Sequence, residues 1–206
     1  MTAERPPLDI DRLLATLDRH HVHFLLVGGV AAIAHGARRP TADLDCLARR
    51  SAGNLARLAA AMRELNARLR VKGLSDAEAA ELPTLLDADT LGRMQISTWR
   101  TDAGDLDVLT EMAGAGGSRL RYDDLVGRAA VLQVVGVTVR VAALDDVIAS
   151  KEWADRPKDQ EALPELRALA SAGNEAGLTG DAPAEGAPEA GGQPPSPRRS
   201  SGPAAP

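Results

Sequence analysis

The stretch FLLVGGVAAIAHGARRPTADLDCL, residues 24–47, decides the fold. Its apolar start predicts a buried strand, its two adjacent glycines predict a tight turn, and the residues after them predict a short helix. A basic loop leads from there to a second predicted strand, which carries Asp43 and Asp45. Because side chains alternate along a strand, these two carboxylates point to the same face, and Leu44 between them faces the core.

This segment combines two features that suit a nucleotide. Two carboxylates held close together repel each other unless a cation lies between them, and a divalent metal ion is the usual cation. Gly28 and Gly29 expose backbone N–H groups just ahead of a helix N-terminus, a place that stabilises a phosphate. Either feature alone is most often a plain turn or a solvated strand. Together, in this order, they predict a phosphate site beside a metal site.

The segment GDLDVLT, residues 104–110, supplies further carboxylates. It follows a predicted strand at 94–98 across the turn TDAG, and the two strands predict a hairpin. Asp105 and Asp107 share one face of the second strand, and we expect Asp107 (or Asp105) to join the Asp-x-Asp pair. Three carboxylates can hold two Mg²⁺ ions, which grip a nucleoside triphosphate and lower the pKa of an attacking hydroxyl group.

The remaining chain predicts more helices and a second hairpin, which together indicate an α+β fold. Predicted helices cover residues 9–20, 51–69, 76–82, 122–126, 144–156 and 158–172, and the second hairpin covers residues 131–142 around Gly136. The helix that begins at Leu144 is interrupted near Pro157. Lys151 and Arg156, close to that interruption, are candidate clamps for a triphosphate.

The composition divides the chain into three parts. Residues 1–143 are expected to form the main domain, and residues 144–173 a C-terminal helical part. Residues 174–206 hold seven of the thirteen prolines together with many Gly, Ala and Ser residues. Such a segment cannot bury enough apolar surface to offset the entropy lost on ordering, so it is expected to be disordered.

Composition and charge exclude several classes of protein. Hydrophobic residues make up 44% of the 206 residues, which suffices for a core, but no apolar run approaches the roughly 20 residues of a membrane span. The N-terminus lacks the apolar stretch of a secretory signal, so a cytoplasmic protein is expected. The only cysteine, Cys46, cannot form an internal disulfide. The net charge of −5 gives no overall basic field, although local arginine clusters can still bind RNA.

The run LVGGVAAIAHGARRPTADLD resembles the signature of the DNA polymerase β-like nucleotidyltransferases, with a spacer at the long end of the usual range. More narrowly, GG…HG.R.T.DLD, GDLDVLTE and VIASKEWADRPKDQEAL, in this order, resemble the AbiEii/MenT-type toxins of type IV toxin–antitoxin systems. The resemblance covers residues 8–172. It implies a minimal nucleotidyltransferase fold, in which helices pack on a mixed β-sheet. Compared with longer AbiEii-like toxins, the chain is expected to lack their large C-terminal helical domain.

The resemblance also implies a role for each matching residue. The glycine turn would bind the nucleotide, the three carboxylates the metal, and Lys151 the nucleotide phosphates. Asp159 matches the aspartate of the final element, here R-P-K-D, in which Lys158 stands where an arginine is commoner. The candidate site therefore consists of catalytic residues Asp43, Asp45, Asp107, Lys151 and Asp159, nucleotide-binding residues Gly28, Gly29, Lys151 and Arg156, and metal ligands Asp43, Asp45 and Asp107.

For function, the resemblance implies Mg²⁺-dependent transfer of a nucleotide from a nucleoside triphosphate to RNA, with the 3′ end of tRNA as the expected acceptor. It also implies a cognate antitoxin protein as partner and no membrane association. Thr41 matches a residue that is phosphorylated in some members, and a phosphate there would place negative charge where metal and triphosphate bind. The opposing interpretation of Thr41 is a loop residue that braces the next strand.

Two other functions remain open from the sequence. The same fold could modify a small molecule, as antibiotic-modifying nucleotidyltransferases do, or a protein side chain. Alternatively, the chain could be a non-catalytic antitoxin or nucleotide-binding module. The intact set of three aspartates argues against a decayed site. No G-x-G-x-x-G and no G-x-x-x-x-G-K-[ST] pattern supports a dinucleotide-binding or P-loop alternative.

Overall fold

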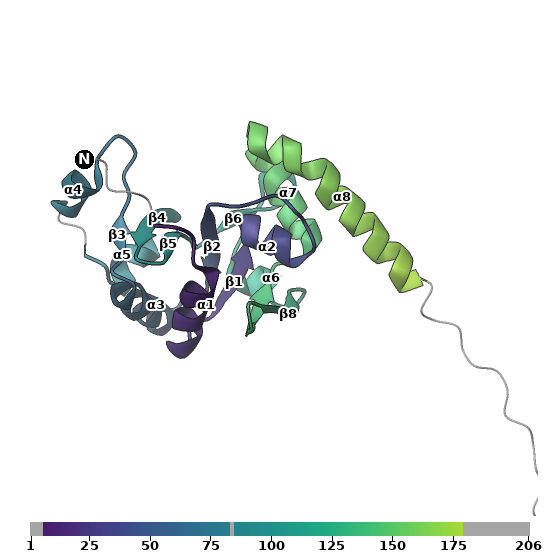
Figure 1. Cartoon of the computed structure of the whole chain (residues 1–206). Coiled ribbons are helices and arrows are strands. Elements are labelled where there is room, and N and C mark those ends of the chain that lie inside the picture. Colours follow the sequence, from purple (N-terminus) through teal and green to yellow (C-terminus); the bar gives the residue numbers. More distant parts are fainter. Residues whose placement is uncertain (1–5, 83–84, 179–206) are drawn as a thin grey trace, which may run out of the picture.

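The computed structural model describes residues 6–82 and 85–178 (Figure 1). The strands are β1 (Phe24–Val27), β2 (Asp43–Ala48), β3 (Arg68–Leu69), β4 (Ile96–Thr101), β5 (Gly104–Leu109), β6 (Met112–Ala113), β7 (Arg119–Leu120), β8 (Ala130–Val134) and β9 (Val137–Val141). The helices are α1 (Ile10–Arg19), α2 (Gly28–Ala34), α3 (Ala52–Glu64), α4 (Asp76–Ala80), α5 (Ala88–Arg93), η1 (Ala115–Gly117), α6 (Tyr122–Leu125), α7 (Leu144–Ala154) and α8 (Pro157–Leu178).

The central sheet is mixed, as the α+β prediction requires. It has seven strands in the order β3-β4-β5-β2-β1-β9-β8, and β6 pairs with β7 in a separate ribbon. Strand β2 is antiparallel to β1 and parallel to β5, and β1 is parallel to β9. The two predicted hairpins are confirmed as the antiparallel pairs β4–β5 and β8–β9. The predicted fold class is therefore confirmed.

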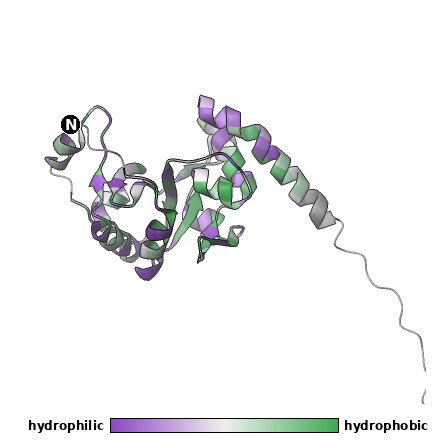
Figure 2. Ribbon diagram, in the orientation of Figure 1, coloured by the Kyte–Doolittle hydropathy of each residue, from purple (hydrophilic) through white to green (hydrophobic). Residues whose placement is uncertain are grey.

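The core lies between the sheet and the helices, and it consists mainly of leucine, valine and alanine. Leu13, Leu14 and Leu17 of α1 and Leu58 and Met62 of α3 are fully buried in it. Figure 2 shows hydrophobic residues along the central strands and both kinds of residue on α3 and α8. In Figure 1, α1, α3 and α5 gather on one side of the molecule and α2, α7 and α8 on another.

The predicted helix 51–69 is wrong at its C-terminal end. Helix α3 ends at Glu64, and Asn66 takes a left-handed conformation with φ 52°, which asparagine tolerates better than most residues. The N–H of Ala67 then bonds the carbonyl of Met62 at 2.9 Å and closes the helix. The freed residues Arg68–Leu69 pair with β4 and form the edge strand β3. The helix α5 and the β6–β7 ribbon were not predicted.

The C-terminal helices follow the predicted interruption. Asp155 takes a left-handed conformation at the end of α7, and α8 begins at Pro157, a position that suits proline because it needs no N–H donor. Helix α8 reaches Leu178, so residues 174–178 are helical where disorder was predicted. The rest of that predicted tail, residues 179–206, lies outside the described residues. The division of residues 1–143 from 144–173 stays a prediction.

In the part of the chain that the structure describes, no helix is both long enough and apolar enough to cross a bilayer.

Candidate active site

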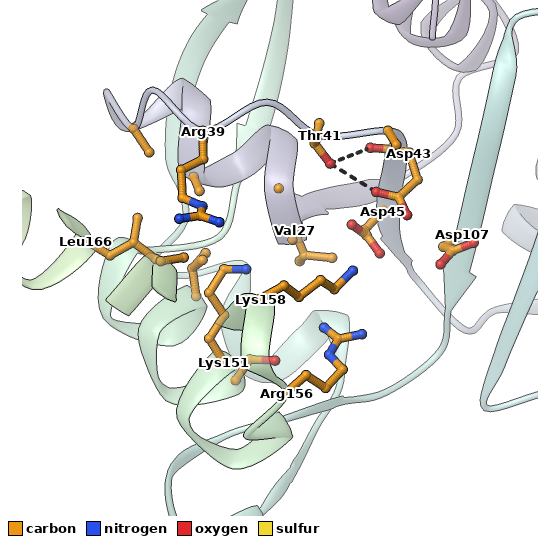
Figure 3. A pocket seen from close by; sticks show the side chains of 18 of the residues that line it. Val27, Arg39, Thr41, Asp43, Asp45, Asp107, Lys151, Arg156, Lys158 and Leu166 are labelled. Atoms are coloured by element: carbon orange, nitrogen blue, oxygen red, sulfur yellow. Dashed lines mark hydrogen bonds between the residues drawn. The ribbon is translucent and has the colours of Figure 1, made fainter. Parts of the chain in front are cut away.

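A cavity of about 370 Å³ opens where the β1–α2 turn, the loop before β2, strands β2 and β5, and helices α7 and α8 meet (Figure 3). The structure brings most of the predicted site residues to this one place. Those that line the cavity are Gly28, Gly29, Thr41, Asp43, Asp45, Asp107, Lys151 and Arg156. Residues more than a hundred positions apart in the sequence therefore share one cavity.

The acidic wall of the cavity consists of Asp43, Asp45 and Asp107. The parallel register of β2 and β5 places Asp45 directly opposite Asp107. Burial, together with the negative charges of Asp43 and Asp107, raises the pKa of Asp45 to about 7. Burial likewise raises the pKa of Asp107. The three carboxylates thus repel one another.

Asp105, the alternative third carboxylate, has a different role. It is fully buried and forms ion pairs with Arg70 at 2.7 Å and with Arg100 at 3.4 Å. Asp107 lines the cavity, and its Oδ1 is buried without a hydrogen-bond partner among the described residues. Of the two candidates, Asp107 therefore has the oxygen that is available for a ligand.

The glycine turn packs directly on the acidic wall. Gly28 has φ +64°, and a Cβ atom there would lie 2.0 Å from Oδ2 of Asp45, so only glycine fits. A Cβ atom on Gly29 would lie 2.4 Å from Oγ1 of Thr41. The backbone N–H of Gly29 favours the charged form of Asp45 and so lowers its pKa, against the larger effect of burial. Nucleotide binding by the glycine turn stays a prediction.

Thr41 braces the strand that follows it. Its hydroxyl donates to Oδ1 of Asp43 at 3.0 Å and lies 3.3 Å from the Asp43 carbonyl oxygen (Figure 3). These contacts agree with the interpretation of Thr41 as a residue that braces the next strand. They also place Thr41 against the acidic wall, so a phosphate added to it would lie beside Asp43.

The basic wall comes from α7 and α8. Figure 3 shows Lys151, Arg156 and Lys158 facing the cavity from the side opposite Asp43, Asp45 and Asp107. Lys151 and Arg156 are both held by Asp159: the Lys151 Nζ lies 3.2 Å from Oδ1, and the Arg156 Nε lies 2.5 Å from Oδ2. The side chain of Lys151 is only 16% exposed, so this contact fixes where its charge lies.

Asp159 acts behind this wall, because its side chain is fully buried and does not line the cavity. Burial favours its neutral form, but the hydrogen bonds from Arg156 and Lys151 outweigh burial and hold the pKa of Asp159 below its usual value. It was predicted among the catalytic residues. In the structure it contacts both cations and does not line the cavity, and a catalytic role stays a prediction.

Lys158 is a site residue that the sequence did not single out. It is exposed, lines the cavity, and its charge lowers the pKa of Asp45. The sequence feature that could have identified Lys158 is its position two residues after Arg156 in R-P-K-D, at the start of a helix. Arg39 of the basic loop also lines the cavity, and its guanidinium bonds Glu161 of α8 at 2.7 Å.

The acidic wall has the donor chemistry of a site for a hard divalent cation. The charge of Asp43 raises the pKa of both Asp45 and Asp107, an effect that a cation would reverse, and Oδ1 of Asp107 has no hydrogen-bond partner among the described residues. As the side chains lie, no three His, Cys, Asp or Glu residues among those described gather closely enough to hold an ion. Asp43, Asp45 and Asp107 could hold Mg²⁺ after side-chain rotation, and this site stays a prediction.

No protein-family model matches the sequence, and no curated protein matches it. Among solved structures, the lincosamide antibiotic adenylyltransferase LnuA, determined with lincomycin bound, is similar with a TM-score of 0.53. It is 11% identical in sequence, and the match covers 81% of this chain and 99% of LnuA. The antibiotic-resistance factor ANT(2'')-Ia matches with a TM-score of 0.49 and 16% identity, over 82% of this chain and 91% of that one.

The likeness to LnuA shows that the chain has the fold of a nucleotidyltransferase. This confirms the broader of the two expectations about its structure. The narrower one, an AbiEii/MenT-type toxin, is not tested by these similarities.

Proposed function

We propose that this protein is a cytoplasmic Mg²⁺-dependent nucleotidyltransferase that transfers a nucleotide from a nucleoside triphosphate to RNA, with the 3′ end of tRNA as acceptor. As the toxin of a toxin–antitoxin pair, with a cognate antitoxin as partner, it would thereby block translation. One observation carries the enzymatic part. An acidic wall of three carboxylates faces a basic wall of Lys151, Arg156 and Lys158 across a single cavity on a nucleotidyltransferase fold.

The two walls divide the work of a nucleotidyl transfer. Lys151, Arg156 and Lys158 bind the β- and γ-phosphates and stabilise the negative charge of the leaving pyrophosphate. Asp159 keeps two of these cations in place, so little reorganisation is needed when the charge develops. Held by Asp43, Asp45 and Asp107, Mg²⁺ would neutralise charge at the α-phosphate and lower the pKa of the attacking hydroxyl.

The proposed transfer exchanges one bond for another at the α-phosphorus of the nucleotide. The acceptor hydroxyl oxygen forms a bond to the α-phosphorus, and the bond from that phosphorus to the bridging oxygen breaks, which releases pyrophosphate. The hydroxyl proton passes to a carboxylate of the acidic wall, where the raised pKa values of Asp45 and Asp107 suit a proton acceptor. The product is the acceptor carrying a nucleoside monophosphate.

The choice of RNA as acceptor rests on the resemblance of the three sequence motifs to the AbiEii/MenT-type toxins. A small-molecule hydroxyl is the second candidate acceptor. It is favoured by the similarity in fold to LnuA, a lincosamide antibiotic adenylyltransferase solved with lincomycin bound.

Labelled nucleoside triphosphates distinguish these acceptors. The purified protein is incubated with Mg²⁺ and each of the four labelled nucleotides, together with total tRNA, with lincomycin or with a protein extract. We expect label on tRNA, and none with an Asp45→Ala variant that remains folded. Label on lincomycin alone would establish a small-molecule hydroxyl as the acceptor. Label on protein alone would exclude both candidates in favour of a protein side chain. Label in no sample would favour a non-catalytic module.

Expression in growing cells tests the toxin role. The wild-type chain is expected to arrest growth, and Asp45→Ala is expected to abolish the arrest. Arrest that persists with Asp45→Ala would show that the toxicity does not come from metal-dependent transfer.

A further inference from the structure

A row of arginines continues the acidic side of the site toward the edge of the sheet. Arg68 on β3 is the direct partner of Arg100 on β4, and Arg100 is the partner of Asp105 on β5. Directly paired residues on neighbouring strands project to the same face, which here is also the face of Asp107, two residues after Asp105. Arg70, just beyond β3, reaches the same face, because its guanidinium bonds Asp105.

The two inner arginines are fixed in place. The fully buried carboxylate of Asp105 accepts from Arg70 at 2.7 Å and lies 3.4 Å from Nε of Arg100. A guanidinium has five N–H donors, so Arg70 retains donors beyond the one that binds this carboxylate. The Arg70 side chain is 37% exposed, and its charge reaches the carboxylate of Asp107. Exposed Arg68 has no ion-pair partner within residues 6–82 and 85–178.

We propose that Arg68, Arg70 and Arg100 bind the phosphates of a nucleic-acid acceptor strand and direct its terminal hydroxyl toward Asp107. This inference rests on the proposed function and names the surface that its acceptor uses. Guanidinium groups bind phosphate oxygens with two parallel hydrogen bonds, and arginine is the preferred side chain for that contact. A small neutral acceptor offers no anionic group to exposed Arg68, which forms no ion pair among the described residues.

The geometry of the transfer selects this side of the cavity. In a phosphoryl transfer the attacking and leaving oxygens lie roughly in line on opposite sides of the phosphorus. The leaving pyrophosphate belongs to the basic wall on α7 and α8, so the acceptor has to approach from the other side. That side is formed by Asp107 and the strands β5, β4 and β3 that follow it in the sheet.

An exposed apolar side chain at the same edge of the cavity suits the sugar and base of a strand. Ile96 is 58% exposed, lines the cavity and is the direct partner of Leu109. Surfaces that bind single strands combine cationic groups for the backbone with side chains that contact the bases, most often aromatic ones. Ile96 is aliphatic and offers an apolar contact without stacking. Helix α4, which carries Glu78 and packs beside β3, limits the row on its outer side. The surface is therefore short and takes only the last few nucleotides.

Arg68 is the residue to test, because substitution of Arg70 or Arg100 would leave the buried Asp105 short of a partner. Binding of a fluorescent single-stranded RNA with a free 3′ hydroxyl is measured without nucleotide or Mg²⁺, over a range of salt concentrations. We expect Arg68→Gln to weaken binding about 5-fold and Arg68→Glu more, and the slope of log K against log salt to fall by about 0.7. Arg12→Gln, an exposed arginine of α1, is the matched control and should change neither quantity.

The transfer reaction gives the second readout. Arg68→Gln should raise KM for RNA by a similar factor and leave KM for the nucleotide unchanged. If both Arg68 variants bind RNA as tightly as the wild type does, the proposal that these arginines bind the acceptor strand is wrong, even if transfer to RNA occurs. If both variants bind RNA more weakly but the wild-type protein transfers no nucleotide to RNA, the RNA-binding role of the arginines is supported and the proposed function fails.

Discussion

Asp45 and Asp107 lie directly opposite each other on the parallel strands β2 and β5, and Asp45 is additionally pressed against the backbone of Gly28. The fold therefore places two carboxylates on neighbouring strands, directly across from each other. Holding them there makes the stability of the protein depend on pH and on cations.

The metal-free protein should lose stability as the pH rises. The pKa of Asp45 rises from 3.8 to about 7 on folding, so between these values the folded chain keeps a proton that the unfolded chain has released. Stability then falls from about pH 4 to pH 7, by at most about 4 kcal/mol. Urea unfolding in EDTA at pH 5 to 8 measures this.

Asp45→Asn is the control for this titration, since it keeps the shape and removes the charge. This variant should remove most of the pH dependence of the unfolding free energy and stabilise the metal-free protein at pH 8. Added Mg²⁺ should stabilise the wild type at pH 8 more than the variant. Equal slopes in the two proteins would contradict the account of Asp45.

Asp159→Asn should impair both the fold and nucleotide binding, because it weakens the partner of Lys151 and Arg156 at a buried position. We expect a loss of about 3 kcal/mol in unfolding free energy and a raised KM for the nucleotide. Glu152→Gln is the matched control. It breaks an exposed ion pair, with Arg167, that joins the same two helices and should cost less than about 1 kcal/mol.

Lys158→Met should separate binding from stability. Lys158 is exposed and lines the cavity, so its loss should raise KM for the nucleotide about 10-fold and change the unfolding free energy by no more than about 0.5 kcal/mol. Steady-state kinetics together with urea unfolding measure both quantities. An unchanged KM would remove Lys158 from the basic wall.

Gly29→Ala should destabilise the protein through Thr41. The new Cβ atom would lie 2.4 Å from Oγ1 and 2.7 Å from Cβ of Thr41, and such overpacking costs about 1–3 kcal/mol. The double variant Gly29→Ala, Thr41→Gly should recover part of that loss. Gly53→Ala, in the first turn of α3, has its nearest neighbour at 3.9 Å and should instead stabilise by up to about 1 kcal/mol. Additive losses at residues 29 and 41 would contradict the contact.

Thr41→Glu should abolish nucleotide transfer, as phosphorylation of Thr41 is expected to do. The Thr41 hydroxyl lies 3.0 Å from Oδ1 of Asp43, so a negative charge at this position repels Asp43 and opposes metal and triphosphate binding. Thr41→Val, which is neutral and of similar size, should keep most of the activity. Full activity in Thr41→Glu would count against regulation at this residue.

Local patterns predicted the elements that carry the acidic wall. The glycine turn, the Asp-x-Asp strand and the β4–β5 hairpin each depend on neighbours in sequence, so a short window of residues was sufficient. The parallel pairing of β2 with β5 joins residues about sixty positions apart, and no local pattern encodes it. Only that pairing places Asp45 opposite Asp107.

The choice between Asp107 and Asp105 also lay beyond the sequence. The two residues share a face, and the difference between them comes from Arg70 and Arg100, which pair with Asp105. Arg70 follows the edge strand β3, whose residues were predicted as the end of a helix. In the same way, the burial of Asp159 beneath Lys151 depends on how α8 packs on α7, which the motif R-P-K-D does not reveal.

The opposing walls of the cavity are synthesised at different times. A chain growing on the ribosome has all three carboxylates once Asp107 has been added, but Lys151, Arg156 and Lys158 follow more than forty residues later. Until α7 and α8 emerge and fold, the cations of the basic wall cannot face the acidic residues. The complete cavity therefore forms only after nearly the whole described chain has been translated, and the proposed antitoxin would have that interval in which to bind the unfinished polypeptide.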